Sequence, residues 1–155
     1  VIALTLALEL PTAEIQATDL WPDALALASD NAARHNLADR VRFTQVDLLP
    51  TGDTVFDLIV ANLPYIPTAE IATLSAEVRH DPASALDGGA DGLELIRRLI
   101  EVAPAHLSPG GALLLEIGAG QANAVNTLLT ARKFRDISVR PDYENVPRFA
   151  VGFHG

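Results

Sequence analysis

The feature that most constrains the fold is the run Ala-Leu-Leu-Leu-Glu-Ile at residues 112–117, in which five of the six side chains are apolar. A short run of this kind is typical of a strand in the middle of a parallel sheet, where other elements cover both faces. Parallel neighbours need long crossover connections, which are usually helices. The run therefore indicates an α/β protein, provided that other strands alternate with helices along the chain.

Strand and helix patterns do alternate. Short apolar runs bounded by turn residues predict strands, and apolar residues at helical spacing predict helices. The predicted strands are residues 14–19, 41–46, 55–61, 112–117, 137–140 and 148–153, and the predicted helices are residues 1–9, 22–35, 93–107 and 122–132. Residues 66–92 read as an irregular loop and residues 108–111 as a turn. This order predicts a doubly wound, mostly parallel sheet that ends in a hairpin-like pair of strands.

Length and composition set the limits of the interpretation. The 155 residues have the size of one domain, so residues 1–155 are expected to form a single one. No apolar stretch reaches the roughly 18 residues of a membrane span. The chain has no cysteine, which excludes disulfides and fits a cytoplasmic protein. It also has no methionine and begins inside a predicted helix without a cap, which indicates a fragment whose N-terminal part is missing.

The charge argues against nucleic acid as a partner. The formal net charge is −9, and the 11 lysine and arginine residues are scattered along the chain. A protein that grips a phosphate backbone usually carries a basic face. No pair among the four histidines has the spacing of metal ligands, so no metal site is expected.

The strongest functional signal is the sequence Asn-Leu-Pro-Tyr at residues 62–65, directly after the strand predicted at 55–61. Open α/β sheets build their active sites at the carboxyl ends of their strands. The Asn62 amide oxygen and the Leu63 carbonyl can accept both hydrogens of an –NH2 group, and the Tyr65 ring can lie against its plane. The four residues therefore predict recognition of a planar amino or amide nitrogen. The reaction expected for a nitrogen held in this way is methylation.

The order of motifs resembles the release-factor glutamine N5-methyltransferases (the HemK family) of the class I S-adenosylmethionine-dependent methyltransferases. The asparagine-proline corner, the glycine-rich segment after it and a Leu-Glu-Ile-Gly strand end follow one another in the family's order. The matching segments are ATDLWPDALALASDNAARHN (17–36), VRFTQVDLL (41–49), FDLIVANLPYIP (56–67), EVRHDPASALDGGADGLELIRRLI (77–100) and LSPGGALLLEIGAGQ (107–121).

The resemblance implies methylation of a glutamine side-chain amide in a peptide chain release factor, with S-adenosyl-L-methionine as the methyl donor. Asn62, Leu63, Pro64 and Tyr65 would be the catalytic residues. The family usually has proline where this chain has Leu63, but the role of that residue is assigned to its carbonyl, which leucine keeps. Pro64 still biases Leu63 toward extended backbone angles.

The resemblance also implies cofactor contacts at the ends of two strands. Asp19 would accept hydrogen bonds from the ribose hydroxyls, and Leu20 or Trp21 would pack on the adenine. Asp47, followed by Leu48, corresponds to the acid that contacts the adenine amino group. Asn62 would also border the cofactor.

The family's glycine-rich cofactor loop and first central strand would precede residue 1, as would its N-terminal substrate-binding region. In related folds that strand lies between the strands predicted here at 14–19 and 55–61. Without it, these two strands would be either unpaired or paired with each other, and exposed sheet edges are prone to aggregation.

Simpler interpretations exist for each motif. The corner at 62–65 has the composition of a tight turn, and Asp19 could cap the helix that follows it. Asp47 could be a solvated acid, Trp21 a packing residue, and Glu116 either structural or part of a site. Gly118-Ala119-Gly120 could itself be a cofactor loop in a permuted methyltransferase, although a short Gly-x-Gly is weak support for one.

Two other functions compete with glutamine methylation. An adenine N6-methyltransferase acting on RNA or DNA could use the same four residues to hold a planar –NH2 group. The acidic charge and the segment Ala-Leu-Asp-Gly-Gly-Ala-Asp-Gly-Leu at 85–93 count against it. The third possibility is a methyltransferase fragment without activity.

Overall fold

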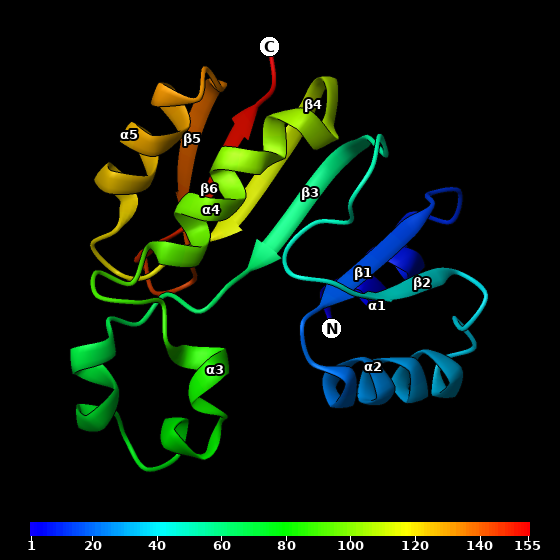
Figure 1. Ribbon diagram of the computed structural model, residues 1–155, viewed down its shortest axis with the longest axis horizontal. Coiled ribbons are helices and arrows are strands. Elements are labelled where there is room, and N and C mark those ends of the chain that lie inside the picture. Colours follow the sequence, from blue (N-terminus) through cyan, green and yellow to red (C-terminus); the bar gives the residue numbers. More distant parts are fainter. The chain divides into compact units, whose positions relative to one another are not determined.

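The strands form two separate sheets, one in each of two compact units, residues 1–52 and 53–155. The computed structural model describes all residues from 1 to 155 (Figure 1). The predicted α/β alternation is confirmed, because helices and strands follow one another in the expected order.

The first unit contains two parallel strands with helices before and between them. Its elements are α1 (Ile2–Glu9), β1 (Ile15–Asp19), α2 (Pro22–Arg34) and β2 (Val41–Gln45). Pro22 stands in the first turn of α2, where its missing N–H costs no hydrogen bond. The core of this unit consists of the buried residues Ala7, Ala32, Leu37 and Val41, with half-buried apolar side chains around them.

The second unit is built on a mixed sheet in the order β3-β4-β6-β5. Its main elements are β3 (Phe56–Asn62), α4 (Glu94–Val102), β4 (Leu107–Glu116), α5 (Ala122–Ala131), β5 (Arg135–Pro141) and β6 (Pro147–Phe153). Strands β3 and β4 are parallel, whereas β6 runs antiparallel to both β4 and β5. The expected hairpin at the end of the chain is therefore confirmed.

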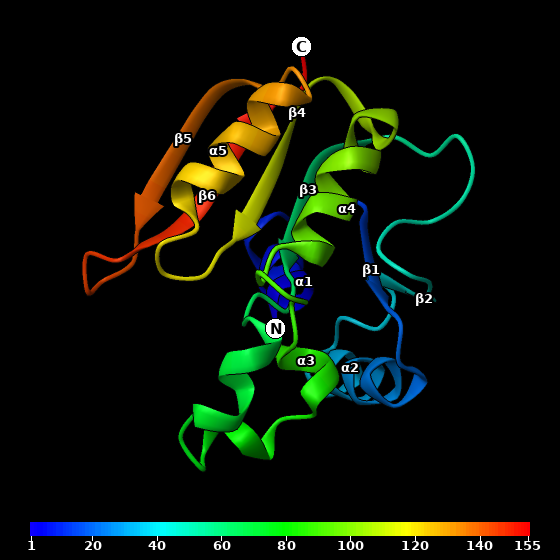
Figure 2. The same cartoon turned by 60° about the vertical axis from the view of Figure 1, so that its left-hand side comes forward.

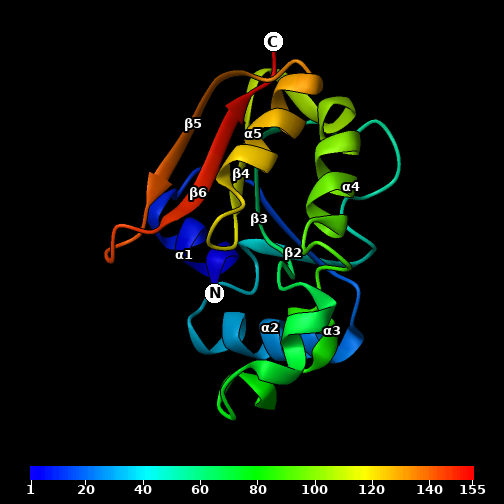
Figure 3. The same ribbon diagram turned by 90° about the vertical axis from the view of Figure 1, so that its left-hand side faces the viewer.

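Alternate residues of the apolar run at 112–117 form the centre of the core. Leu113, Leu115 and Ile117 are fully buried, whereas Leu114 between them is half-buried. Helices α4 and α5 pack side by side along this sheet (Figures 2 and 3), and their buried side chains include Ile96, Leu99, Ile100, Val125 and Leu129. The run is thus buried most completely on one face of the sheet.

Two segments differ from the sequence-based expectation. The stretch at 66–92, predicted to be irregular, contains three short helices: η1 (Thr68–Thr73), η2 (Val78–His80) and α3 (Ala83–Leu86). Prolines are the N-cap residues of the first and the third of them, with extended ψ angles of 136° and 137° that mark where each helix begins. None of the helices in the protein has the length and apolar character needed to cross a membrane.

The second difference is at 93–111. The predicted helix ends early, because α4 stops at Val102 and a short 3-10 helix, η3 (Ala103–His106), follows it. The predicted turn at 108–111 belongs to β4 instead. Leu107 is the register partner of Phe56, and the Gly111 carbonyl accepts the N–H of His154 at 2.7 Å. Pairing with distant strands thus overrides the local turn preference of a Pro-Gly-Gly sequence.

Strands β1 and β3 belong to different sheets. β1 pairs only with β2, and β3 is an edge strand that pairs only with β4.

Candidate active site

The corner at 62–65 follows β3 without an intervening residue. Asn62 is the last residue of the strand, its side chain is exposed, and the amide has no hydrogen-bond partner within the protein. In the parallel register it lies beside Glu116, the last residue of β4. The Asn62 amide is therefore directed away from the core, at the carboxyl ends of two parallel strands, where ligands bind in open α/β sheets.

The rest of the corner is half-buried, because a second segment pairs with it. The N–H of Ile66 donates to the Leu86 carbonyl at 3.0 Å, and the N–H of Gly88 returns a bond to the Ile66 carbonyl at 2.9 Å. A Cβ atom at Gly88 would lie 2.8 Å from both the Pro64 carbonyl oxygen and the Tyr65 Cα. Only glycine permits so close an approach, which explains the glycine at position 88.

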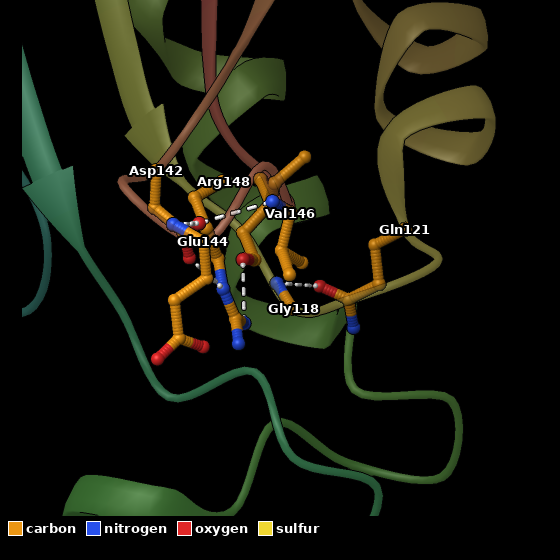
Figure 4. A network of polar contacts seen from close by, with 7 residues as sticks. Gly118, Gln121, Asp142, Glu144, Val146 and Arg148 are labelled. Atoms are coloured by element: carbon orange, nitrogen blue, oxygen red, sulfur yellow. Dashed lines mark hydrogen bonds and ion pairs between the residues drawn. The ribbon is translucent and has the colours of Figure 1, made fainter.

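A glutamine that the sequence analysis left without a role joins three segments at this corner. The Gln121 Nε2 donates to the Tyr65 carbonyl at 3.0 Å and to the Gly92 carbonyl at 3.2 Å. Its Oε1 accepts the N–H of Gly118 at 2.7 Å (Figure 4). The Gly118 N–H is thus already used, whereas a cofactor loop at 118–120 would need such groups for its ligand. The only signal in the sequence was the position of Gln121 at the end of a matching motif.

The turn between β5 and β6 is held by one carboxylate. Asp142 accepts hydrogen bonds from the N–H of Glu144 at 2.8 Å and of Val146 at 3.0 Å, and it pairs with the Arg148 Nε at 3.3 Å. A second nitrogen of Arg148 donates to the Ile117 carbonyl at 3.4 Å (Figure 4). The turn is therefore tied to Ile117, which follows the end of β4 and precedes Gly118.

Hydrogen bonds lower the pKa of three carboxylates in the second unit. The Thr68 hydroxyl and the Gly89 N–H lower the pKa of Asp87 below 3.8. The Arg97 side chain, with the Leu93 N–H, does the same for Asp91. For Asp142 the largest cause is the Val146 N–H, and partial desolvation acts in the opposite direction.

These shifts predict a loss of stability in acid. A carboxylate with a lowered pKa in the folded state stabilises that state above its unfolded pKa, here about 3.8. The contribution disappears as the pH falls below that value and through the folded pKa. We expect the free energy of unfolding of an Asp87→Asn variant to fall less than that of the unmodified protein between pH 5 and pH 2. Chemical denaturation at each pH measures this, with Asp53→Asn, an exposed turn residue, as the control. Equal slopes for all three proteins would contradict the assignment.

Five of the six residues predicted to contact the cofactor, all except Asn62, lie in the first unit, and three of them meet at one end of its sheet. Asp19 ends β1, and its carbonyl accepts the N–H of Val46 at 3.0 Å. The Thr18 hydroxyl donates to the Leu48 carbonyl at 2.7 Å, so the segment containing Asp47 and Leu48 lies beside the end of β1. Leu48 has a φ angle of 64°, which is uncommon for a residue other than glycine.

The Asp19 carboxylate has one committed oxygen and one that could bind a ligand. Its Oδ1 accepts the N–H of Trp21 at 2.9 Å, which fixes the turn before α2. The N-cap residue of that helix is Trp21, so Asp19 orders the turn rather than capping the helix. Leu20 and Trp21 are 51% and 52% exposed, which leaves their apolar surfaces accessible to a flat ligand.

Comparison with known proteins extends these observations. The chain is 49% identical over 154 residues to a release factor glutamine methyltransferase of Moorella thermoacetica, and 43% identical over 153 residues to one of Geobacter sulfurreducens. The matches cover 98% and 97% of this chain but 54% and 53% of the relatives. The chain thus spans about half the length of these curated relatives. A ribosomal protein uL3 glutamine methyltransferase of Bordetella pertussis is 44% identical over 120 residues, which are 76% of this chain and 40% of that protein.

Solved structures show the same fold. A methyltransferase from Pyrococcus furiosus superposes with a TM-score of 0.74 at 19% identity, covering 99% of this chain and 68% of that one. The expected class I methyltransferase fold is therefore confirmed. The model of the methyltransferase small domain matches residues 1–139, which is most of the sequence. The chain belongs to the methyltransferase small domain family.

Proposed function

We propose that the protein containing this chain is an S-adenosylmethionine-dependent methyltransferase that modifies the side-chain amide of a glutamine in a peptide chain release factor. The observation that carries the proposal is the exposed Asn62 amide, without a partner in the protein, at the end of β3. The names of the relatives support the choice of glutamine as the modified residue. We place the reaction in the cytoplasm, where release factors act.

The corner offers two acceptors that would position a weakly nucleophilic amide nitrogen. Such a nitrogen is a poor nucleophile, because its lone pair is delocalised into the carbonyl. The Asn62 Oδ1 and the Leu63 carbonyl, which accepts no hydrogen bond from the protein, would each accept a hydrogen bond from the substrate –NH2. This holds the nitrogen in a fixed direction, and positioning of this kind can lower a barrier by roughly 7–11 kcal/mol in favourable cases. The Tyr65 ring would cover the plane of the amide and exclude water.

The cofactor would supply an electrophilic methyl group on a sulfonium centre. We assign its binding to the ends of β1 and β2. The free oxygen of Asp19 would accept hydrogen bonds from the ribose hydroxyls. Leu20 and Trp21 would pack on the adenine. The segment of Asp47 and Leu48 would accept a hydrogen bond from the adenine amino group. Residues 1–155 would act together as one catalytic domain.

The function is tested by transfer of labelled methyl groups in the full-length gene product. The substrates are a purified release factor, ribosomal protein uL3 and ribosomal RNA, each incubated separately with labelled S-adenosylmethionine. We expect label on the release factor, at the glutamine, and none on RNA. Label on RNA alone would replace the proposal with adenine methylation, label on uL3 alone would change the substrate, and no label on any of them would contradict a methyltransferase of this kind.

The cofactor assignment predicts weaker binding when Asp19 is replaced. Asp19→Asn keeps an oxygen for the Trp21 N–H but loses the charged acceptor for the ribose. Hydrogen bonds to charged groups contribute about 1.5–3 kcal/mol, so we expect the Kd for S-adenosylmethionine to rise roughly 10- to 100-fold. Calorimetry measures this change. Asp30→Asn, in an exposed position of α2, is the matched control. An unchanged Kd for Asp19→Asn would remove Asp19 from the cofactor site.

A further inference from the structure

The Asn-Leu-Pro-Tyr corner depends on a side chain that is distant in the sequence. Gln121, the residue before α5, donates both of its amide hydrogens to carbonyls of the corner and of the glycine-rich segment. We propose that Gln121 is a positioning residue that fixes the direction of the Leu63 carbonyl and the Tyr65 ring relative to the end of β4. The proposal rests on the proposed function, because it assigns a role within the same corner.

The hydrogen-bonding pattern requires an amide at this position. The Tyr65 and Gly92 carbonyls are both acceptors, and a side-chain –NH2 is the group that can donate to the two at once. On the other side the Gly118 N–H is a donor, and the Gln121 Oε1 receives it at 2.7 Å. A glutamate of the same size could accept from Gly118, but its second oxygen would face two carbonyl oxygens. The Tyr65 and Gly92 carbonyls would then have no donor, and leaving them without one costs more free energy than the loss of one ordinary hydrogen bond.

Gln121 contacts Gly118, just after the end of β4, and this end of the strand is also held by β6. The N–H of Ile117 donates to the Arg148 carbonyl at 2.9 Å, and the Arg148 side chain donates to the Ile117 carbonyl at 3.4 Å. Arg148 is oriented in turn by Asp142, the carboxylate that closes the β5–β6 turn (Figure 4). A chain of polar contacts therefore runs from the hairpin through β4 to Gln121, and from Gln121 to the corner.

Close packing at Gly118 brings the Tyr65 ring into the same arrangement. A Cβ atom at Gly118 would lie 3.2 Å from Cδ2 of the Tyr65 ring and 2.9 Å from the Gln121 Oε1. The ring thus passes over Gly118 while the Tyr65 carbonyl is held by the Gln121 amide. Because the polar atoms of Gln121 are engaged within the protein, it acts on a substrate only through the residues that it holds.

The test compares Gln121→Glu and Gln121→Ala with Ser108→Ala in the full-length gene product. Ser108 is the matched control, because its hydroxyl joins β4 to β3 at the opposite end of the strands, through Asp57 at 2.8 Å. Two quantities are measured: hydrogen exchange of the Ile66, Thr68 and Gly88 amides, and kcat and KM for methyl transfer to a release factor. The exchange measurement does not depend on activity.

We expect both Gln121 variants to exchange these three amides at least about tenfold faster than the unmodified protein. Their kcat should fall roughly 10- to 100-fold, because misplacement of a reacting group by about 1 Å has an effect of this size. The KM for S-adenosylmethionine should stay within about twofold. At lower pH the Gln121→Glu variant should recover part of its kcat relative to Gln121→Ala, because a protonated carboxyl can donate one hydrogen bond.

Unchanged exchange and unchanged kcat in both Gln121 variants would overturn the proposal. Equal acceleration of exchange in Ser108→Ala would also overturn it, because the effect would then reflect general stability of the sheet. If the unmodified protein transfers no methyl group to a release factor, the proposed function fails. The exchange measurement then still decides whether Gln121 holds the corner.

Discussion

Replacement of Asn62 with alanine is expected to lower kcat for methyl transfer by about 10²- to 10³-fold, the effect seen when one preorganised hydrogen-bonding group is removed from an active site. The amide is exposed and has no partner in the protein, so the variant should unfold at the same temperature as the unmodified protein. Single-turnover methyl transfer, combined with thermal unfolding, separates loss of chemistry from loss of structure.

Two further variants test whether the loss of kcat comes from the acceptor oxygen of Asn62. Asn62→Asp keeps an acceptor oxygen and should retain more activity than Asn62→Ala. Asn123→Ala removes an exposed asparagine side chain from α5 and should have no effect on kcat. An Asn62→Ala enzyme with undiminished kcat would show that the corner does not hold the reacting nitrogen, and the proposed mechanism would have to be abandoned.

Replacement of Gly88 with alanine is expected to cost about 3 kcal/mol in the free energy of unfolding, at the upper end of the usual range for overpacking. The added Cβ would lie 2.7 Å from the Gly92 carbonyl oxygen and 2.8 Å from the Pro64 carbonyl oxygen. Both neighbours are backbone atoms, so no flexible side chain can move aside. The corner must shift instead, and we expect kcat to fall together with stability.

Gly110→Ala provides the comparison for Gly88→Ala. Gly110 has a φ angle of +79°, and no atom lies within 4 Å of the position that a Cβ would take there. Alanine at this position therefore carries only a backbone penalty of about 1–2 kcal/mol. Urea denaturation of both variants measures the difference. A Gly88→Ala variant as stable as Gly110→Ala, or more so, would show that the contact between Gly88 and the corner is not tight.

Most of the regular elements could be predicted from local patterns. Apolar runs and helical spacing place β1, α2, β2 and β3 to within one or two residues of their observed bounds. The position of the Asn-Leu-Pro-Tyr corner at the end of a strand could be predicted in the same way. The roles of its four residues remain a proposal, which the Asn62 variants test.

The misplaced elements share one cause, because their structure depends on contacts with distant residues. Pro109, Gly110 and Gly111 favour a turn locally, but pairing with the end of the chain keeps them in β4. The short helices within 66–92 lack the length that gives a clear periodic pattern. Gln121 is marked in the sequence only by its position at the end of a matching motif, and nothing in its neighbourhood along the chain shows that it would bond to Tyr65 and Gly92.

The sequence by itself determined that the chain alternates strands with helices, that an amide would stand at the end of β3, and that the run at 112–117 would supply the core. These properties follow from side-chain polarity and spacing, which act over a few residues. Only the tertiary structure decided the division of the strands into two sheets, the close approach of Gly88 to the corner and the three hydrogen bonds of Gln121. Each of these depends on the packing of segments far apart in the chain, which no local pattern records.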